Sequence, residues 1–307
     1  MIEVNDLTVE MTNRCNLSCP YCFAESNTKT EQLSVEEIKK AISIVKPKRA
    51  VAFSGGEPLL RQDDVIEIIP HAFQYAKRVR IETNGTIPVK WDKLLVDGNK
   101  KDIRFNTSLD GYKEVTDARR GIGVFDKVTN LIREANEHGY IIFGKATFDD
   151  DVLLNDTDHL YEFAKFCKEL GMVSMRFGNV KDSGRGKKIV NDDYRDVIIK
   201  MSENIFNASQ RVEKEYNCTG LDGYGYVAAD LCGRCNYERN DLILGVDGIL
   251  RLECQFLNVP LCHYTRYTPQ LHEAGLYFMK MNNLGMTFDK LGGVVPKGKS
   301  VFDVVKK

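Results

Sequence analysis

The feature that most constrains the fold is an alternation of short strand-like runs with longer helical patterns. Residues rich in Val, Ile and Phe predict strands at 7–11, 49–53, 78–83, 102–108, 141–148 and 173–177. Between them, apolar residues recur at helical spacing over 35–45, 64–76, 91–95, 125–137 and 158–170. Parallel strands need crossover connections, so repeated βα units predict a parallel sheet. Six such units predict an α/β fold, a partial (β/α)6 barrel of the TIM type.

Local signals support these boundaries. Ser34 followed by Glu37 is typical of a capping box at a helix start, and Gly139 and Gly171 stand where helices are expected to end. In barrels of this kind, functional groups lie at the carboxyl ends of the strands. The residues that follow each predicted strand are therefore the first place to look for a site.

A change in composition after residue 180 predicts a second domain. A polar, glycine-rich stretch at 181–186 precedes a long charged helix at 192–215. Cysteines then reappear at positions 218, 232, 235, 254 and 262. We therefore expect a barrel over residues 1–215 and a smaller domain with a tail over 216–307.

The overall composition excludes some classes of protein. The 307 residues are 43% hydrophobic and carry a formal net charge of -1, which suits a large core and indicates neither nucleic-acid nor membrane partners. The first residues form no secretory signal, and no apolar run approaches the roughly 18 residues of a membrane span. Nine cysteines in a chain expected to be cytoplasmic indicate metal or redox chemistry more than disulfides.

The strongest chemical signal is a cysteine triple near the start of the chain. Cys15, Cys19 and Cys22 are spaced C-x3-C-x2-C. Three thiolates on one short loop fit a [4Fe–4S] cluster and leave one iron open for chemistry. A zinc site with a fourth ligand and a disulfide are the alternatives, but structural zinc usually uses two separated pairs.

Three later strand ends carry polar or glycine-rich motifs. Gly55, Gly56, Glu57 and Pro58 follow the second predicted strand, where the glycines allow close backbone approach to a ligand and the carboxylate can accept a bond from an ammonium group. Short polar side chains end the third and fourth strands and suit ribose hydroxyls, although Asn-Gly and Asp-Gly are also ordinary turn formers. They are Thr83 and Asn84, then Ser108 and Asp110.

Taken together over about residues 7–255, these motifs resemble the radical S-adenosylmethionine (SAM) superfamily. The resemblance implies that Cys15, Cys19 and Cys22 hold a catalytic cluster whose open iron binds SAM, and that one electron yields a 5′-deoxyadenosyl radical. It assigns Glu57 and its neighbours to the methionyl amine. It places Tyr21 near adenine, unless that ring is only a core aromatic.

The stretch from Ser108 to Phe125 resembles the peptide-modifying branch of the family. There Ser108 contacts the ribose, and Arg119 or Arg120 contacts the SAM carboxylate. Lys145 and Arg176, on later strands, are further candidates for that carboxylate, or else ion-pair partners only.

A second cysteine set predicts a second metal site. Cys232 and Cys235 form a CxxC, and Asp247-Gly248 predicts a hairpin that folds Cys254 back toward it. The fourth ligand is Cys262 or Cys218; the one left over could donate a hydrogen atom to a catalytic radical or simply pack. A zinc ribbon uses the same pattern. The resemblance to the twitch variant of the SPASM extension, and to the GTP cyclase of molybdenum-cofactor synthesis, implies instead an auxiliary [4Fe–4S] cluster.

The expected function is hydrogen abstraction from a peptide or protein, leading to a crosslink, an epimer or an excision. The resemblance implies a flavodoxin- or ferredoxin-type electron donor. Because no recognition domain is expected before Asp6, we also expect either a separate peptide-recognition protein or direct binding of the peptide to the barrel. The alternatives are a small molecule such as a nucleotide or sugar alcohol, and a zinc-stabilised binding module without catalysis. The substrate, the fate of SAM and the oligomeric state stay open.

Overall fold

The computed structural model describes residues 4–27, 32–94, 102–148, 157–180, 184–188, 194–216, 227–230, 241–247, 249–252 and 260–263. The chain divides into two compact units. The first unit comprises Met1–Asn13, Thr30–Val79 and Gly233–Lys307, and the second comprises Arg14–Lys29 and Arg80–Cys232. Strand β3 (Arg78–Thr83) spans the division.

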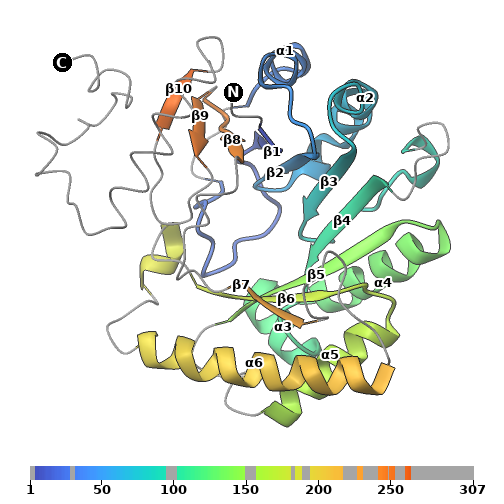
Figure 1. Cartoon of the computed structure of the whole chain (residues 1–307), viewed down its shortest axis with the longest axis vertical. Helices are drawn as coiled ribbons and strands as arrows, with labels where there is room; N and C mark the ends of the chain where they lie inside the picture. The colour runs from blue at the N-terminus through green and yellow to red at the C-terminus, as the bar shows by residue number, and fades with distance from the viewer. Residues whose placement is uncertain are drawn as a thin grey trace, which may run out of the picture. The chain divides into compact units, whose positions relative to one another are not determined.

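The first unit is built on the strand order β10-β9-β8-β1-β2. Strand β1 pairs in parallel with β2 and β8, and the pairs β8–β9 and β9–β10 are antiparallel. Helices α1 and α2 pack together, as Figure 1 shows in blue and teal. The bounds are β1 Asp6–Thr12, α1 Val35–Val45, β2 Ala50–Gly55, α2 Gln62–Ala72, β8 Leu242–Leu244, β9 Ile249–Leu252 and β10 Pro260–His263.

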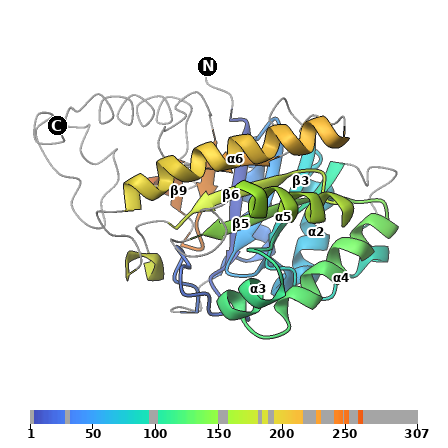
Figure 2. The ribbon, with the colours of Figure 1, turned by 90° about the horizontal axis from the view of Figure 1, so that it is seen from below.

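The second unit carries the parallel strand order β4-β5-β6-β7. Its helix α6 lies along α5 and also contacts β7 (Figure 2). The bounds are β4 Ile103–Ser108, α3 Lys113–Arg120, α4 Val124–Glu137, β5 Ile141–Phe148, α5 Thr157–Glu169, β6 Met175–Asn179, α6 Tyr194–Tyr216 and β7 Val227–Asp230. Alternation along these strands sends one set of side chains to the helices and the other to the opposite face.

The helix-facing side of these strands is an apolar core. Phe105, Ile142 and Phe177 are fully buried, and the Phe177 ring meets the Phe163 ring of α5 at 6.3 Å. The opposite face carries Ser108 and other polar residues that are only partly buried. The sheet of the second unit therefore has one buried apolar face, which packs against the helices, and one partly exposed polar face, where ligand-binding groups can lie.

Most of the predicted elements are confirmed. Strands β3 and β5 have the predicted bounds, and the other early strands agree within two residues. The Ser34–Glu37 capping box is present at α1, and Gly139 and Gly171 end their helices with φ of +78° and +103°. The predicted hairpin is confirmed, because β8 and β9 pair with Leu242 opposite Leu252.

Two local elements differ from the predictions. The helix expected at 91–95 is a short 3-10 helix, Trp91–Lys93. Helix α3 was not predicted, because the sequence Lys-Glu-Val-Thr-Asp-Ala-Arg-Arg has too few apolar residues to show a helical period.

The predicted domain boundary at residue 216 stays a prediction. Cys218, Cys232, Cys235 and Cys254 lie outside the described residues, and Cys262 lies on β10, where the backbone alone is described. Within the described ranges, no helix is both long and apolar enough to cross a membrane.

Candidate cofactor site

The cysteine loop follows β1 in the chain and belongs to the second unit. Cys15, Cys19 and Cys22 are all partly exposed, and none of them forms a disulfide. Short-range hydrogen bonds shape the loop. The Asn27 side chain accepts from the Cys15 amide at 2.7 Å, and the Cys22 amide donates to the Cys19 carbonyl at 3.3 Å. The loop thus carries three cysteine thiols, none of them in a disulfide, over eight residues.

Each thiol has a polar surrounding. Burial raises the pKa of the Cys19 thiol, and the positive charge of Arg120 opposes that rise. The sulfur of Cys15 accepts from the Asn84 side-chain amide at 3.6 Å, and the sulfur of Cys22 lies 3.7 Å from the Ser26 hydroxyl. Hydrogen bonds to the sulfurs are among the factors that set an iron–sulfur potential.

The loop can supply the three thiolates that an iron–sulfur cluster would need. Among the described residues, no group of three His, Cys, Asp or Glu side chains is placed to hold one ion. Tetrahedral zinc needs its ligands to converge on one point. A [4Fe–4S] cluster takes its thiolates on different irons, so the thiols can stay apart on a loop. Three cysteine thiols on one loop are consistent with the cluster.

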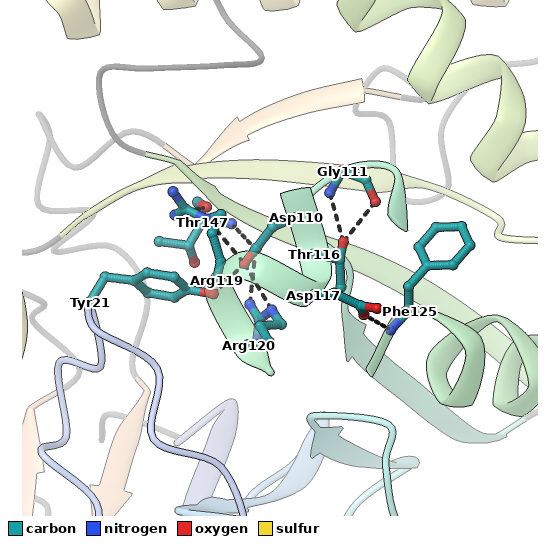
Figure 3. A network of polar contacts seen from close by, with 9 residues as sticks. All are labelled: Tyr21, Asp110, Gly111, Thr116, Asp117, Arg119, Arg120, Phe125 and Thr147. Carbon is teal, nitrogen blue, oxygen red and sulfur yellow. Dashed lines mark hydrogen bonds and ion pairs between the residues drawn. The ribbon is translucent and has the colours of Figure 1, made fainter. Parts of the chain in front are cut away.

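Tyr21, between the second and third cysteines, ties the loop to the end of β4 (Figure 3). Its hydroxyl donates to Asp110, and its ring lies 4.5 Å from the Arg119 guanidinium carbon and 5.5 Å from that of Arg120. Cation–π contacts of this kind add to the hydrogen bond. Burial and the neighbouring Asp110 charge raise the pKa of Tyr21, so this phenol stays protonated at neutral pH.

Asp110 is the fully buried centre of this network (Figure 3). It accepts from Arg120 Nε at 2.8 Å, from Arg120 Nη2 at 2.9 Å and from the Thr147 amide at 2.8 Å. Burial acts to raise the pKa of Asp110, but the charges of Arg120 and Arg119 hold that pKa below its ordinary value. The carboxylate is thus ionised and joins the cysteine loop, β4, α3 and β5.

The two predicted arginines differ in their contacts within this network and in their exposure. Both carboxylate oxygens of Asp110 bind the guanidinium of Arg120, which is 7% exposed. Arg119 is 15% exposed, donates to the Thr147 carbonyl at 2.7 Å and reaches Asp110 only at 3.5 Å. The geometry favours Arg119 for ligand contact and favours a positioning role for Asp110 and Arg120.

Two side chains in the motif after Asp110 form hydrogen bonds with backbone groups. The Thr116 hydroxyl donates to the Gly111 carbonyl at 2.7 Å, and Asp117 accepts from the amides of Gly123 at 3.0 Å and Phe125 at 2.8 Å. These bonds cap the start of α4 and close the loop after β4 (Figure 3). Thr116 and Asp117 therefore hold the backbone of this stretch in place.

Three predicted residues meet on the polar face of the second unit. Ser108 is in register with Lys145, and Lys145 is in register with Arg176, on three adjacent strands. Lys145 forms an ion pair with Glu82 at 2.7 Å, and Glu82 also accepts from Asn106 at 2.5 Å. Although burial acts to raise the pKa of Glu82, the charge of Lys145 lowers it. Lys145 is thus partly committed to an ion pair, and Arg176 lies beside it.

The end of β3 faces the cysteine loop. Asn84 accepts from the Thr86 amide at 3.0 Å and donates to Asn16 Oδ1 at 2.9 Å, in addition to the bond to Cys15. Thr83 accepts from the Gly85 amide at 3.0 Å. The predicted turn chemistry is present here, and Asn84 also contacts Cys15, while the predicted ribose contact stays a prediction.

The glycine motif after β2 belongs to the first unit. Gly55 has φ of +128°, and a Cβ built there would overlap the Thr12 carbonyl oxygen. The Gly56 amide donates to the same oxygen at 2.6 Å. Glu57 is fully buried, and its carboxylate accepts from the Leu59 amide at 3.0 Å at the start of the short helix Pro58–Arg61. These glycines thus bring the backbone against β1, and their predicted close approach to a ligand stays a prediction.

An α/β protein with three cysteine thiols on one loop and a charged network beside them is typical of enzymes that bind an open iron–sulfur cluster. The family model of the radical SAM superfamily matches residues 9–167, from β1 into α5. The chain therefore belongs to the radical SAM superfamily. Membership implies a [4Fe–4S] cluster and SAM binding.

Proteins with several different activities are similar in sequence to this chain. The subtilosin biosynthesis protein AlbA of Bacillus subtilis is 29% identical over 60% of this chain and 41% of its own. The mycofactocin maturase MftC of Mycolicibacterium smegmatis is 31% identical over 61% of this chain and 47% of its own. A GTP 3′,8-cyclase of Aliarcobacter butzleri is 30% identical over 77% of each chain. The chain thus spans less than half the length of the two biosynthesis proteins.

Solved structures confirm the fold. Streptococcus suis SuiB bound to precursor peptide SuiA has a TM-score of 0.69 at 17% identity, covering 88% of this chain and 66% of that one. The enzyme anSMEcpe with bound AdoMet has a TM-score of 0.67 at 20% identity, covering 92% of this chain and 84% of that one. The α/β fold predicted from the alternating pattern is that of solved radical SAM enzymes.

Sequence reasoning missed one group at the cysteine loop. Arg185, after β6, donates to the Cys19 carbonyl at 2.8 Å. Its segment was interpreted only as a polar, glycine-rich transition between domains. A lone arginine in such a segment carries no sequence signal for a contact with a loop so far away in the chain.

Proposed function

We propose that this protein cleaves SAM reductively and abstracts a hydrogen atom from a peptide or protein substrate. The observation that carries the proposal is the loop of three cysteines outside any disulfide, tied through Tyr21 to the Asp110–Arg119–Arg120 network. Cys15, Cys19 and Cys22 would hold the cluster. When bound, the cluster supplies the electron that converts SAM to methionine and a 5′-deoxyadenosyl radical.

The chain's own residues orient SAM and offer polar or charged groups to its carboxylate, ribose and amine. The Arg119 guanidinium, held against the Tyr21 ring, and the cations Lys145 and Arg176 offer donors for the SAM carboxylate. Ser108, at the end of β4, offers a hydroxyl to the ribose. The close backbone approach at Gly55 and Gly56 shapes the turn that leads to Glu57, which we assign to the methionyl amine.

Similarity to peptide-modifying enzymes supports a peptide substrate. AlbA and MftC act in bacteriocin and mycofactocin biosynthesis, and the SuiB structure contains a precursor peptide. The Ser108-Leu-Asp-Gly111 stretch adds a motif of that branch. The proposal includes a flavodoxin- or ferredoxin-type electron donor, a separate peptide-recognition protein and an auxiliary [4Fe–4S] cluster held by Cys232, Cys235, Cys254 and Cys262 or Cys218.

A nucleotide substrate is the second candidate. The alignment with the Aliarcobacter butzleri GTP 3′,8-cyclase extends over 262 residues and 77% of each chain, further than the alignments with AlbA and MftC. A second GTP 3′,8-cyclase, from Methanococcus vannielii, is 29% identical over 81% of this chain. This length of similarity favours a small phosphorylated substrate for the same radical chemistry.

The first experiment tests the cysteine loop. Anaerobically reconstituted protein is supplied with SAM and dithionite, and 5′-deoxyadenosine is quantified. We expect Cys19→Ala to abolish its formation, because a cluster ligand is lost. Cys167→Ala is the matched control, since Cys167 is a free, fully buried cysteine on α5. Undiminished 5′-deoxyadenosine in Cys19→Ala would refute the assignment.

The second experiment separates the two substrate classes. The enzyme is offered either deuterated peptides free of nucleotides or deuterated GTP, and deuterium in 5′-deoxyadenosine is measured by mass spectrometry. Hydrogen abstraction carries the label from the substrate into that product. Transfer from the peptide sample supports the proposal, whereas transfer from GTP alone establishes the second candidate.

A further inference from the structure

The short segment after β6 binds the backbone of the cysteine loop. Gly184–Lys188 forms a 3-10 helix, and Arg185 is separated from Cys19 by 166 positions in the chain. The Arg185 amide donates to the Cys22 carbonyl at 3.0 Å. Its side chain donates through Nε to the Cys19 carbonyl at 2.8 Å and through Nη1 to the Ser26 carbonyl at 3.1 Å. One residue thus holds three carbonyls of the loop.

The chemistry of arginine suits this arrangement. A guanidinium presents several N–H donors in a rigid plane, so it can bind two carbonyls at once. Lysine carries its charge at one flexible point and is less suited to hold Cys19 and Ser26 together. The contacts therefore depend on the shape of Arg185 as well as on its charge.

Gly184 makes the close approach possible. It has φ of +54°, and a Cβ at this position would lie 2.5 Å from the carbonyl oxygens of both Cys22 and Phe23. Real side chains do not tolerate such contacts, so the backbone here can approach the loop only as glycine. Gly184 and Arg185 act together, one by lacking a side chain and the other by using one.

The same arginine places positive charge beside a predicted ligand. The Arg185 guanidinium donates to the Cys19 carbonyl at 2.8 Å, so its positive charge lies next to this residue. An iron–sulfur cluster becomes more negative when it is reduced, and a nearby cation favours the reduced form. The position of Arg185 is therefore suited to both holding the loop and easing reduction.

We propose that Gly184 and Arg185 form a clamp on the cysteine loop, in which Arg185 is a positioning residue that retains the cluster and raises its reduction potential. This inference rests on the proposed assignment of Cys15, Cys19 and Cys22 as cluster ligands. It adds a contribution from the end of β6 to a site otherwise built from the cysteine loop, β3, β4, α3 and β5.

The test compares Arg185→Gln and Arg185→Lys with the wild type after anaerobic reconstitution. The readouts are iron per chain, the rate of iron loss to a chelator, and the midpoint potential from a redox titration followed by electron paramagnetic resonance. We expect Arg185→Gln to release iron faster by about 10- to 100-fold, the usual effect of losing a group that orients a metal ligand. Its potential should also become more negative.

The lysine variant separates shape from charge. Arg185→Lys should keep a potential close to that of the wild type while still releasing iron faster. Arg211→Gln is the control for loss of a cation elsewhere in the second unit, because Arg211 pairs with Asp158 and lies against the Tyr161 ring. It should match the wild type in all readouts.

Gly184→Ala keeps every charge and tests the clamp if Arg185→Gln fails to fold. It should release iron faster with no change in potential. Wild-type rates and potential in Arg185→Gln, or a wild-type rate in Gly184→Ala, would overturn the clamp while leaving the cluster assignment intact. Failure of the wild type itself to take up iron would overturn both assignments.

Discussion

At the residue scale, Asp110 decides how the candidate site is held. It is a buried carboxylate that accepts two bonds from Arg120 and one from the Thr147 amide, besides the Tyr21 hydroxyl. A buried charge is tolerated only when it is paired and hydrogen-bonded. Because one carboxylate connects the cysteine loop to three other elements, its loss affects stability and the site together.

We expect Asp110→Asn to lower the free energy of unfolding by about 3–5 kcal/mol at pH 7, since it leaves the buried Arg120 without its counter-charge. Urea unfolding at several pH values measures this. The native pKa of Asp110 lies below its ordinary value of 3.8, so the stabilisation is complete above that value and is lost as the pH falls through the lower native pKa. The difference between wild type and variant should therefore shrink below about pH 4.

The control for this variant is Asp126→Asn. Asp126 pairs with Lys113 on the surface, where its side chain is 61% exposed, so its removal should have little effect on unfolding. Equal losses in the two variants would show that the buried network is not the source of the effect.

At the element scale, the turn after β2 depends on a close contact with β1. Gly55 fits there because it lacks a side chain that would overlap the Thr12 carbonyl, and because φ of +128° is readily adopted by glycine alone. The contact places the Gly56 amide on the same oxygen. The motif is therefore shaped by strand packing before any ligand binds.

Gly55→Ala should lower both the free energy of unfolding and the affinity for SAM. Gly139→Ala is the matched control, because Gly139 also has positive φ but has nothing within 4 Å of an added Cβ. The control should cost only the backbone conformation, about 1–2 kcal/mol. Urea unfolding and equilibrium dialysis with SAM are the measurements, and equal effects of the two changes would contradict the close-contact argument.

At the scale of the whole molecule, the C-terminal hairpin determines what the later cysteines can do. Strands β8 and β9 pair with Leu242 opposite Leu252, so the chain enters and leaves the hairpin at one end. Cys235 precedes that end by seven residues and Cys254 follows it by two. The pairing supports the expectation that the two cysteines share one site.

Changing Cys232 and Cys235 together to alanine should remove about four irons per chain if they hold an auxiliary [4Fe–4S] cluster. Iron and sulfide are quantified after anaerobic reconstitution, and zinc is measured in parallel. Cys167→Ala should leave the iron content unchanged. Full iron content in the double variant would exclude an auxiliary cluster at these cysteines, and loss of zinc in its place would establish a zinc ribbon.

Local chemistry explains which features were predictable. The spacing of apolar residues predicted the strands and most helices, and the Ser34–Glu37 pair predicted the capping box of α1. Both signals are local, because they act within a few residues of the chain. Helix α3 escaped because its polar sequence shows no period; contacts of Thr116 and Arg120 with the end of β4 hold it in place.

The cysteine triple and the glycine motif could likewise be recognised from the sequence, because the spacing of thiols and the absence of a side chain are local properties. Only the tertiary structure revealed that Asp110 binds both Tyr21 and Arg120, that Asn84 faces Cys15, and that Arg185 holds the cysteine loop. Those partners lie far apart in the chain, and they meet because parallel strands deliver their carboxyl ends to one edge of a sheet.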